Sequence, residues 1–161
     1  MLTEGCHFGV VTSGVIEPVT EDMMSVARYL GACHCGAVRF AVALDLVEGA
    51  SRCNCAICTK LPSMGAFAKP IAFTLLSDEA ALGVYEWGAK ASRRYFCKTC
   101  GVHCFGRGDL PELGGAFVSV NVHVLEGVDP SRVQVTYWDG RHDPWQAGPH
   151  DARWPIRVEA A

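Results

Sequence analysis

The feature that most constrains this chain is the clustering of seven of its nine cysteines. They form a C-x-C pair, a C-x-C-x-x-C triplet and a C-x-x-C pair: Cys33 and Cys35; Cys53, Cys55 and Cys58; Cys97 and Cys100. Two cysteines separated by one residue do not readily bridge each other, because a disulfide needs a particular Cα separation and particular Cβ directions. Their sulfurs can instead converge on one ion, and Zn²⁺ binds four thiolates at about 2.3 Å in a tetrahedron. The spacing therefore predicts metal ligands.

The number of clustered cysteines is also informative. Four thiolates close a structural zinc site, whereas three leave a coordination position open, as catalytic zinc requires. Seven cysteines therefore fit one site of each kind, although spacing alone does not say which clusters combine.

Length and composition indicate one globular domain that keeps its thiols reduced. Half of the 161 residues are hydrophobic, and no apolar run approaches the ~20 residues of a membrane span. The first thirty residues lack a basic n-region and a sustained apolar h-region, and they contain four acidic residues: Glu4, Glu17, Glu21 and Asp22. These features argue against a secretory signal. We therefore expect a cytoplasmic protein that is not bound to a membrane, in which clustered cysteines indicate metal or reactivity more than disulfides.

Charge is unevenly distributed along the chain. The net charge of −3 argues against a general nucleic-acid binder. Between residues 52 and 107, however, there are eight basic residues and only three acidic ones. Basic side chains near thiolates lower thiol pKa values and offset the charge of a zinc–thiolate site. They could also hold a small anionic ligand, and the candidates are Arg52, Lys60 and Arg94.

The residue pattern divides the chain into three parts and predicts a mainly antiparallel β domain. Residues 1–27 are an N-terminal extension, 28–150 the domain and 151–161 a C-terminal tail. Cys6 and His7 in the extension have no ligand partners at short spacing, so we assign them no role.

Apolar residues alternate over 38–44 and 118–124, which is typical of half-buried strands. Shorter β-prone runs span 73–76, 84–87, 92–96, 102–105 and 133–138. Residues 78–82 could form one helical turn with Ser77 as N-cap. No segment of ten or more residues shows a convincing 3.6-residue period.

Three ordered motifs carry a resemblance to a known family. They are GACHCGAVRF at 31–40, CNCAIC at 53–58 and FCKTCGVH at 96–103, with SVNV at 119–122 and WDG at 138–140 as further matches. Over residues 29–146 the chain resembles the glutathione-dependent formaldehyde-activating enzyme (GFA) family, whose domain is shared with centromere protein V. The full set of cysteine motifs is specific, whereas a single C-x-x-C would not be.

The resemblance implies an Mss4-like zinc-bound antiparallel β fold and a carbon–sulfur lyase. By position, the structural zinc ligands would be Cys33, Cys35, Cys97 and Cys100. A second, catalytic zinc with an open position would be held by Cys53, Cys55 and Cys58. The type reaction joins formaldehyde to glutathione as S-(hydroxymethyl)glutathione, so the implied partners are a small thiol such as glutathione and an aldehyde.

An open three-thiolate site suits delivery of a thiolate better than activation of water. Three thiolates weaken the Lewis acidity of the ion, whereas a thiol that enters the open position loses its proton and becomes nucleophilic. His103 could be a structural histidine or a proton donor beside the site. Cys104 could be a small buried hydrophobe or an extra thiol near a site.

The C-terminal part is aromatic, and these side chains could pack against the sheet or form a substrate wall: Tyr137, Trp138, Trp145 and Trp154. Asp139, Arg141 and His142 are the polar candidates beside them.

A non-catalytic zinc-stabilised module that binds nucleic acid or protein is the main alternative. The basic middle of the chain favours it, whereas the negative net charge and the lack of a Lys/Arg run count against nucleic acid.

Overall fold

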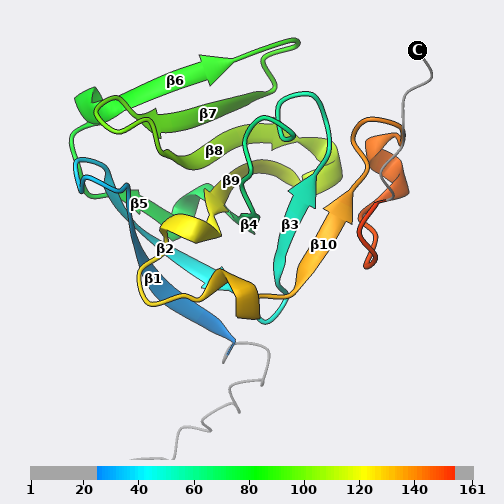
Figure 1. Cartoon of the computed structure of the whole chain (residues 1–161), viewed down its shortest axis with the longest axis horizontal. Coiled ribbons are helices and arrows are strands. Elements are labelled where there is room, and N and C mark those ends of the chain that lie inside the picture. The colour runs from blue at the N-terminus through cyan, green and yellow to red at the C-terminus, as the bar shows by residue number, and fades with distance from the viewer. Residues whose placement is uncertain (1–24, 155–161) are drawn as a thin grey trace, which may run out of the picture.

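The computed structural model describes residues 25–154 and is mainly β (Figure 1). One sheet has the strand order β1 (Val26–Ala32), β2 (Arg39–Asp45), β5 (Phe73–Leu75). The second has the order β10 (Val135–Trp138), β3 (Ala50–Cys53), β4 (Gly65–Ala68), β9 (Gly115–Asn121), β8 (His103–Leu110), β7 (Ser92–Cys97), β6 (Leu82–Glu86). Short 3₁₀ turns connect them: η2 (Pro70–Ala72), η3 (Glu79–Ala81), η4 (Pro111–Leu113), η5 (Val122–Val124), η6 (Pro130–Arg132) and η7 (Trp145–Ala147). The predicted fold class is confirmed.

Every pair of neighbouring strands is antiparallel except β10 and β3. These two run in parallel from Val135 opposite Ala50 to Trp138 opposite Cys53, side by side in Figure 1. Parallel pairing brings their C-terminal ends to the same edge of the sheet. The residues that follow Trp138 therefore lie beside the residues that follow Cys53.

An aromatic cluster forms the centre of the core. The Phe40 ring stacks on Phe73 at 5.2 Å and meets Phe105 edge-on at 5.7 Å, which joins the two sheets. Tyr95 stacks on the other side of Phe105 at 4.9 Å. The alternating apolar residues over 38–44 are the ones that enter this core: residues 38, 40, 42 and 44 are almost fully buried. Burial of each such side chain contributes about 1.5–3 kcal/mol.

The alternating run over 118–124 does not remain a strand to its end. Strand β9 stops at Asn121, and residues 122–124 form η5 instead. The Asn121 side chain accepts a hydrogen bond from the His123 backbone N–H at 3.3 Å and so caps this turn. A side-chain cap of this kind competes with the sheet ladder, which the apolar period does not reveal.

The expected cap of the 78–82 turn was wrong by one residue. Asp78, not Ser77, caps η3 by accepting a hydrogen bond from the Ala80 backbone N–H at 2.8 Å. The Ser77 hydroxyl instead accepts one from the Arg39 backbone N–H at 3.2 Å.

Strands β1, β3 and β4 were not predicted. The seven residues of β1 show no clear alternation, and β3 and β4 have only four residues each. Cys33 and Cys35 lie in the turn between β1 and β2.

Strand β1 begins at Val26. The predicted boundaries of the extension and the tail stay predictions, and Cys6 and His7 lie outside the described residues. Within residues 25–154, the helical turns are too short to cross a membrane.

Candidate metal centres

Four sulfurs from two distant turns meet at one end of the domain. They belong to Cys33 and Cys35 in the β1–β2 turn, to Cys97 at the end of β7 and to Cys100 in the turn that follows, and all four lie within 4.8 Å of one another. The Cys35 sulfur is 3.6 Å from those of both Cys33 and Cys97. Tetrahedral zinc with bonds of about 2.3 Å places its sulfurs roughly 3.8 Å apart, so the spacing fits such an ion.

Backbone N–H groups support negative charge on this four-cysteine group. The Val38 N–H donates to the Cys33 sulfur at 3.2 Å. The Val102 N–H and then that of Cys35 are the main causes that lower the pKa of Cys100 to about 6. Gly101, at φ 73°, makes the tight turn that points the following N–H back toward Cys100. A thiolate is the form that binds metal, so this turn favours ligation.

A separate group of three sulfurs follows strand β3. Cys53 ends the strand, and Cys55 and Cys58 lie in the turns after it, with the three sulfurs within 4.8 Å of one another. Hydrogen bonds from the thiols of Cys53 and Cys58 lower the pKa of Cys55, whereas hydrogen bonds within the group raise the pKa values of Cys53 and Cys58. The close approach of the three sulfurs therefore favours ionisation of Cys55 first.

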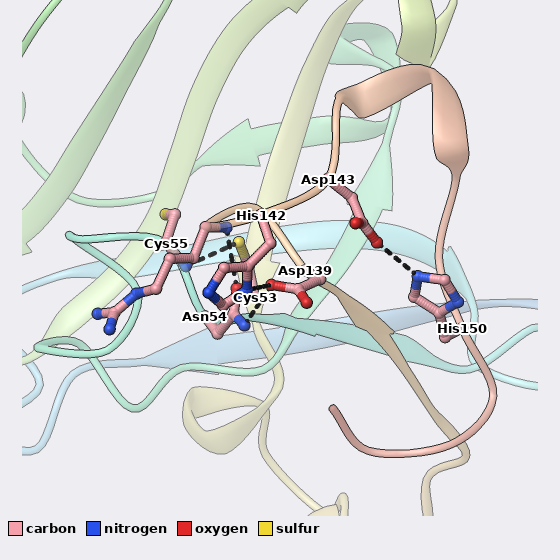
Figure 2. A network of polar contacts seen from close by, with 8 residues as sticks. Cys53, Asn54, Cys55, Asp139, His142, Asp143 and His150 are labelled. Atoms are coloured by element: carbon pink, nitrogen blue, oxygen red, sulfur yellow. Dashed lines mark hydrogen bonds and ion pairs between the residues drawn. The ribbon is translucent and has the colours of Figure 1, made fainter. Parts of the chain in front are cut away.

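A buried polar network joins the three-cysteine group to the end of β10 (Figure 2). Asn54, between two of the cysteines, is 5% exposed, and its amide nitrogen donates to the Asp139 carboxylate at 2.6 Å. Its amide oxygen accepts from the Arg141 backbone N–H at 3.1 Å. His142 Nδ1 is 2.7 Å from the same Asp139 oxygen. Buried polar groups that are fully paired hold one geometry, so this network fixes the loop that carries the three-cysteine group.

Gly140 packs directly against these sulfurs. A Cβ at this position would lie 2.8 Å from the Cys53 sulfur and 3.2 Å from the Cys55 Cβ. Any side chain here would displace the three-cysteine group.

The three-cysteine group lines a cavity of about 120 Å³. Arg94 lies beside it, with Nη2 donating to the Cys58 sulfur at 3.6 Å and the guanidinium 5.5 Å from the Trp87 ring centre. The rest of the wall consists of serines and apolar side chains: Ser51, Ser63, Ser92, Ser119, Phe67, Leu110, Leu113, Phe117 and Trp138, with Gly65. Arg52 and Lys60 do not line this cavity. None of the four-cysteine group lines it either.

Cys104 does not join either group of sulfurs. It is fully buried, and its thiol donates to the Val102 carbonyl at 3.4 Å. Burial, reinforced by the negative charge of Cys33, raises its pKa to about 12. Cys104 therefore lies near the four-cysteine group, but its burial favours the role of a small buried hydrophobe over that of an extra thiol in the site.

His103 lies in a second hollow, which also touches Leu61, Pro62, Ser63 and Asn121. Both ring nitrogens are buried without a hydrogen-bond partner among the described residues. Burial, with the nearby charge of Arg94, lowers the His103 pKa to about 4, so the ring is neutral at pH 7.

Sequence reasoning missed several cavity residues. Trp87 follows β6, whereas Phe67 lies in β4 and Phe117 in β9, and only the order of the strands in the sheet brings these side chains to one cavity. Ser119 offered a signal, since it is a polar residue within a valine-rich strand and is 7% exposed.

Two comparisons bear on this arrangement. A family model described as glutathione-dependent formaldehyde-activating enzyme matches residues 28–140, which include all seven clustered cysteines. The chain belongs to this family.

The GFA assignment agrees with a structural match. The crystal structure of a Rhodobacter sphaeroides protein is 30% identical to this chain, with a TM-score of 0.60. The match covers 68% of this chain and 98% of that one. The two cysteine groups of this GFA-family chain could each hold a metal ion, whereas their division into structural and catalytic sites stays a prediction.

The two groups should respond differently to loss of one ligand. Removing a ligand from a four-cysteine site removes metal binding that is coupled to folding, and such binding is worth ~10–16 kcal/mol in small zinc motifs. We expect Cys97→Ser to be insoluble or strongly destabilised. Cys55→Ser should fold with a modest loss of melting temperature but lose the second ion. Calorimetry with elemental analysis checks this, and equal destabilisation by both variants would contradict the division.

Gly140→Ala should disturb the three-cysteine group alone. Overpacking costs about 1–3 kcal/mol, which at 1.4 kcal/mol per factor of ten corresponds to roughly 5- to 150-fold weaker metal binding. Chelator competition should show one weakened ion and one unchanged ion. The control is Gly148→Ala, at φ 74° with open space around it, which should keep both ions. Unchanged binding in Gly140→Ala would mean that this glycine does not shape the site.

Proposed function

We propose that this protein is a zinc-dependent carbon–sulfur lyase that acts on a thiol–aldehyde adduct, similar to S-(hydroxymethyl)glutathione synthase. The observation that carries the proposal is the contrast between the two sulfur groups. Three sulfurs face a cavity and leave room for a further ligand, whereas the four-cysteine group can satisfy an ion by itself and lines no part of that cavity. A reducing compartment such as the cytoplasm would keep these thiols available.

Two zinc ions per chain fit the donor sets. All seven donors are thiols, and the sulfurs of each group lie within 4.8 Å of one another, which suits zinc better than hard cations that prefer oxygen. Cys33, Cys35, Cys97 and Cys100 would hold the structural ion, and Cys53, Cys55 and Cys58 the catalytic one. Zinc bound by the latter three would lower the pKa of an entering thiol and hold it as a thiolate.

The chain's own residues then place and shield the reactants. In the synthetic direction the thiol gives up its proton, its sulfur bonds to the carbonyl carbon, and the carbonyl oxygen takes up a proton. Arg94 lies beside Cys58 and offsets the negative charge that accumulates there. The apolar walls of the cavity exclude water, which strengthens this interaction and limits competing hydration.

Metal content gives a direct check of the cofactor. We expect protein purified under reducing conditions to carry up to two zinc ions per chain, one held more tightly than the other. Three protein ligands bind more weakly than four, so the second ion should be the one lost to a mild chelator. Elemental analysis that finds no zinc, or iron with visible absorption, would contradict the assignment.

Thiol binding tests the open site. In cobalt-substituted protein, 2-mercaptoethanol should change the sulfur-to-metal charge-transfer band. Its affinity should rise with pH until the pKa of the free thiol, about 8.5 for a cysteine thiol, is reached, because only the thiolate binds the metal. Cys55→Ser should lose the response. Turnover of a panel of thiols and aldehydes should likewise be lost in Cys55→Ser. If thiols leave the spectrum unchanged, the site is closed and a zinc-stabilised binding module becomes the better interpretation.

A further inference from the structure

The cavity carries one cation and no carboxylate to balance it. Arg94 is the only Lys or Arg that lines it, and no Asp or Glu among the described residues does. Arg94 forms no ion pair with a carboxylate within residues 25–154. Its Nε is buried without a partner there. Its charged neighbour in the cavity is the three-cysteine group, whose negative charge a bound Zn²⁺ would largely offset, so the guanidinium can also bind an anionic ligand.

Three neighbours hold the Arg94 side chain in place. It passes over Gly106 of β8, where a Cβ would lie 2.9 Å from Nη1, and it lies beside Trp87. Its Nη2 is 3.6 Å from the Cys58 sulfur. This separation is close to the roughly 3.8 Å between two sulfurs of one tetrahedral zinc site. The guanidinium can therefore reach an anionic oxygen that lies close to the substrate's sulfur.

The remainder of the cavity is apolar. Phe67 and Phe117 meet edge-on at 5.6 Å, and Leu110 and Leu113 continue this wall. The Phe67 side chain is 44% exposed, although it lies in a strand between two neighbours. An apolar cavity of about 150 Å³ binds benzene, so a volume of about 120 Å³ encloses only part of a thiol with an aromatic arm, and the rest of the arm would lie against the partly exposed Phe67 side chain.

Glutathione fits this lining poorly. It carries two carboxylates, both remote from its sulfur, and an ammonium group. The lining offers no acid for the ammonium and no second cation, and its walls would desolvate these charges without compensation.

We propose that the thiol substrate is a small monoanion with its carboxylate next to the carbon that bears sulfur and with an apolar arm. Arg94 binds the carboxylate, and the Phe67–Phe117 wall binds the arm. This inference rests on the proposed thiol chemistry of the three-cysteine group and narrows the thiol that it uses.

Four thiols separate the two recognition elements. They are 2-mercapto-3-phenylpropanoate with both features, thiolactate with the anion alone, 2-phenylethanethiol with the arm alone, and glutathione. Dissociation constants are measured from the charge-transfer band of the cobalt-substituted full chain. We expect 2-mercapto-3-phenylpropanoate to bind at least about tenfold tighter than each of the others, since one good charge-assisted contact contributes about 1.5–3 kcal/mol.

Variants then test the carboxylate contact and the apolar wall separately. Arg94→Met should weaken 2-mercapto-3-phenylpropanoate about tenfold more than it weakens 2-phenylethanethiol. Arg93→Met is the matched control, because Arg93 is exposed and pairs with Glu86 instead. Phe67→Ser should reduce the advantage of 2-mercapto-3-phenylpropanoate over thiolactate. If Arg94→Met loses its metal, Arg94→Lys is the deciding variant. It keeps the positive charge beside Cys58 but not the planar guanidinium that matches a carboxylate, so it should weaken binding of the anionic thiols alone.

The outcomes distinguish this inference from the proposed function. Tightest binding by glutathione, or equal effects of the Arg94 and Arg93 variants, overturns the inference and leaves the lyase proposal intact. Failure of every thiol to bind overturns the lyase proposal and this inference with it.

Discussion

The contact between the Cys35 and Cys97 sulfurs, 3.6 Å apart, joins parts of the chain that are 62 residues apart. One of these cysteines lies in the three-stranded sheet's β1–β2 turn and the other ends β7 of the seven-stranded sheet. Four thiols this close repel one another once ionised, so a shared cation would make the arrangement favourable. Such a cation would tie together the two sheets, between which the phenylalanine cluster is buried.

The second sulfur group depends on a different constraint, the parallel pairing of β10 with β3. This pairing puts Asp139 and Gly140 against the loop that carries Cys53 and Cys55. Asp139 fixes the loop by accepting a hydrogen bond from Asn54, and Gly140 lets the loop approach closely because it has no side chain. The three-cysteine group therefore gains its shape from polar contacts and backbone proximity, and the side facing Arg94 is left to the cavity. Rigid support with one accessible side is what a reactive metal site needs.

The sequence was informative wherever the signal is local. Cysteine spacing identified the candidate ligands, and the alternation over 38–44 located a strand. It failed where structure depends on tertiary pairing: Asn121 ends a run of alternating valines by capping a turn, and β3 and β4 are too short to show a period. The cavity wall was beyond reach for the same reason, because Trp87, Phe117 and Arg94 meet only through the order of strands in the sheet.

The central claim is that seven thiols divide into a closed group of four and an open group of three. X-ray absorption at the zinc edge, on protein loaded with two ions per chain, measures this division directly. Sites with four and three sulfurs predict an average of 3.5 sulfur ligands per zinc at about 2.3 Å, with lighter atoms completing the shell. Addition of a binding thiol should raise the average to about 4. An average of 4 before any thiol is added would show that both sites are closed and would contradict the account.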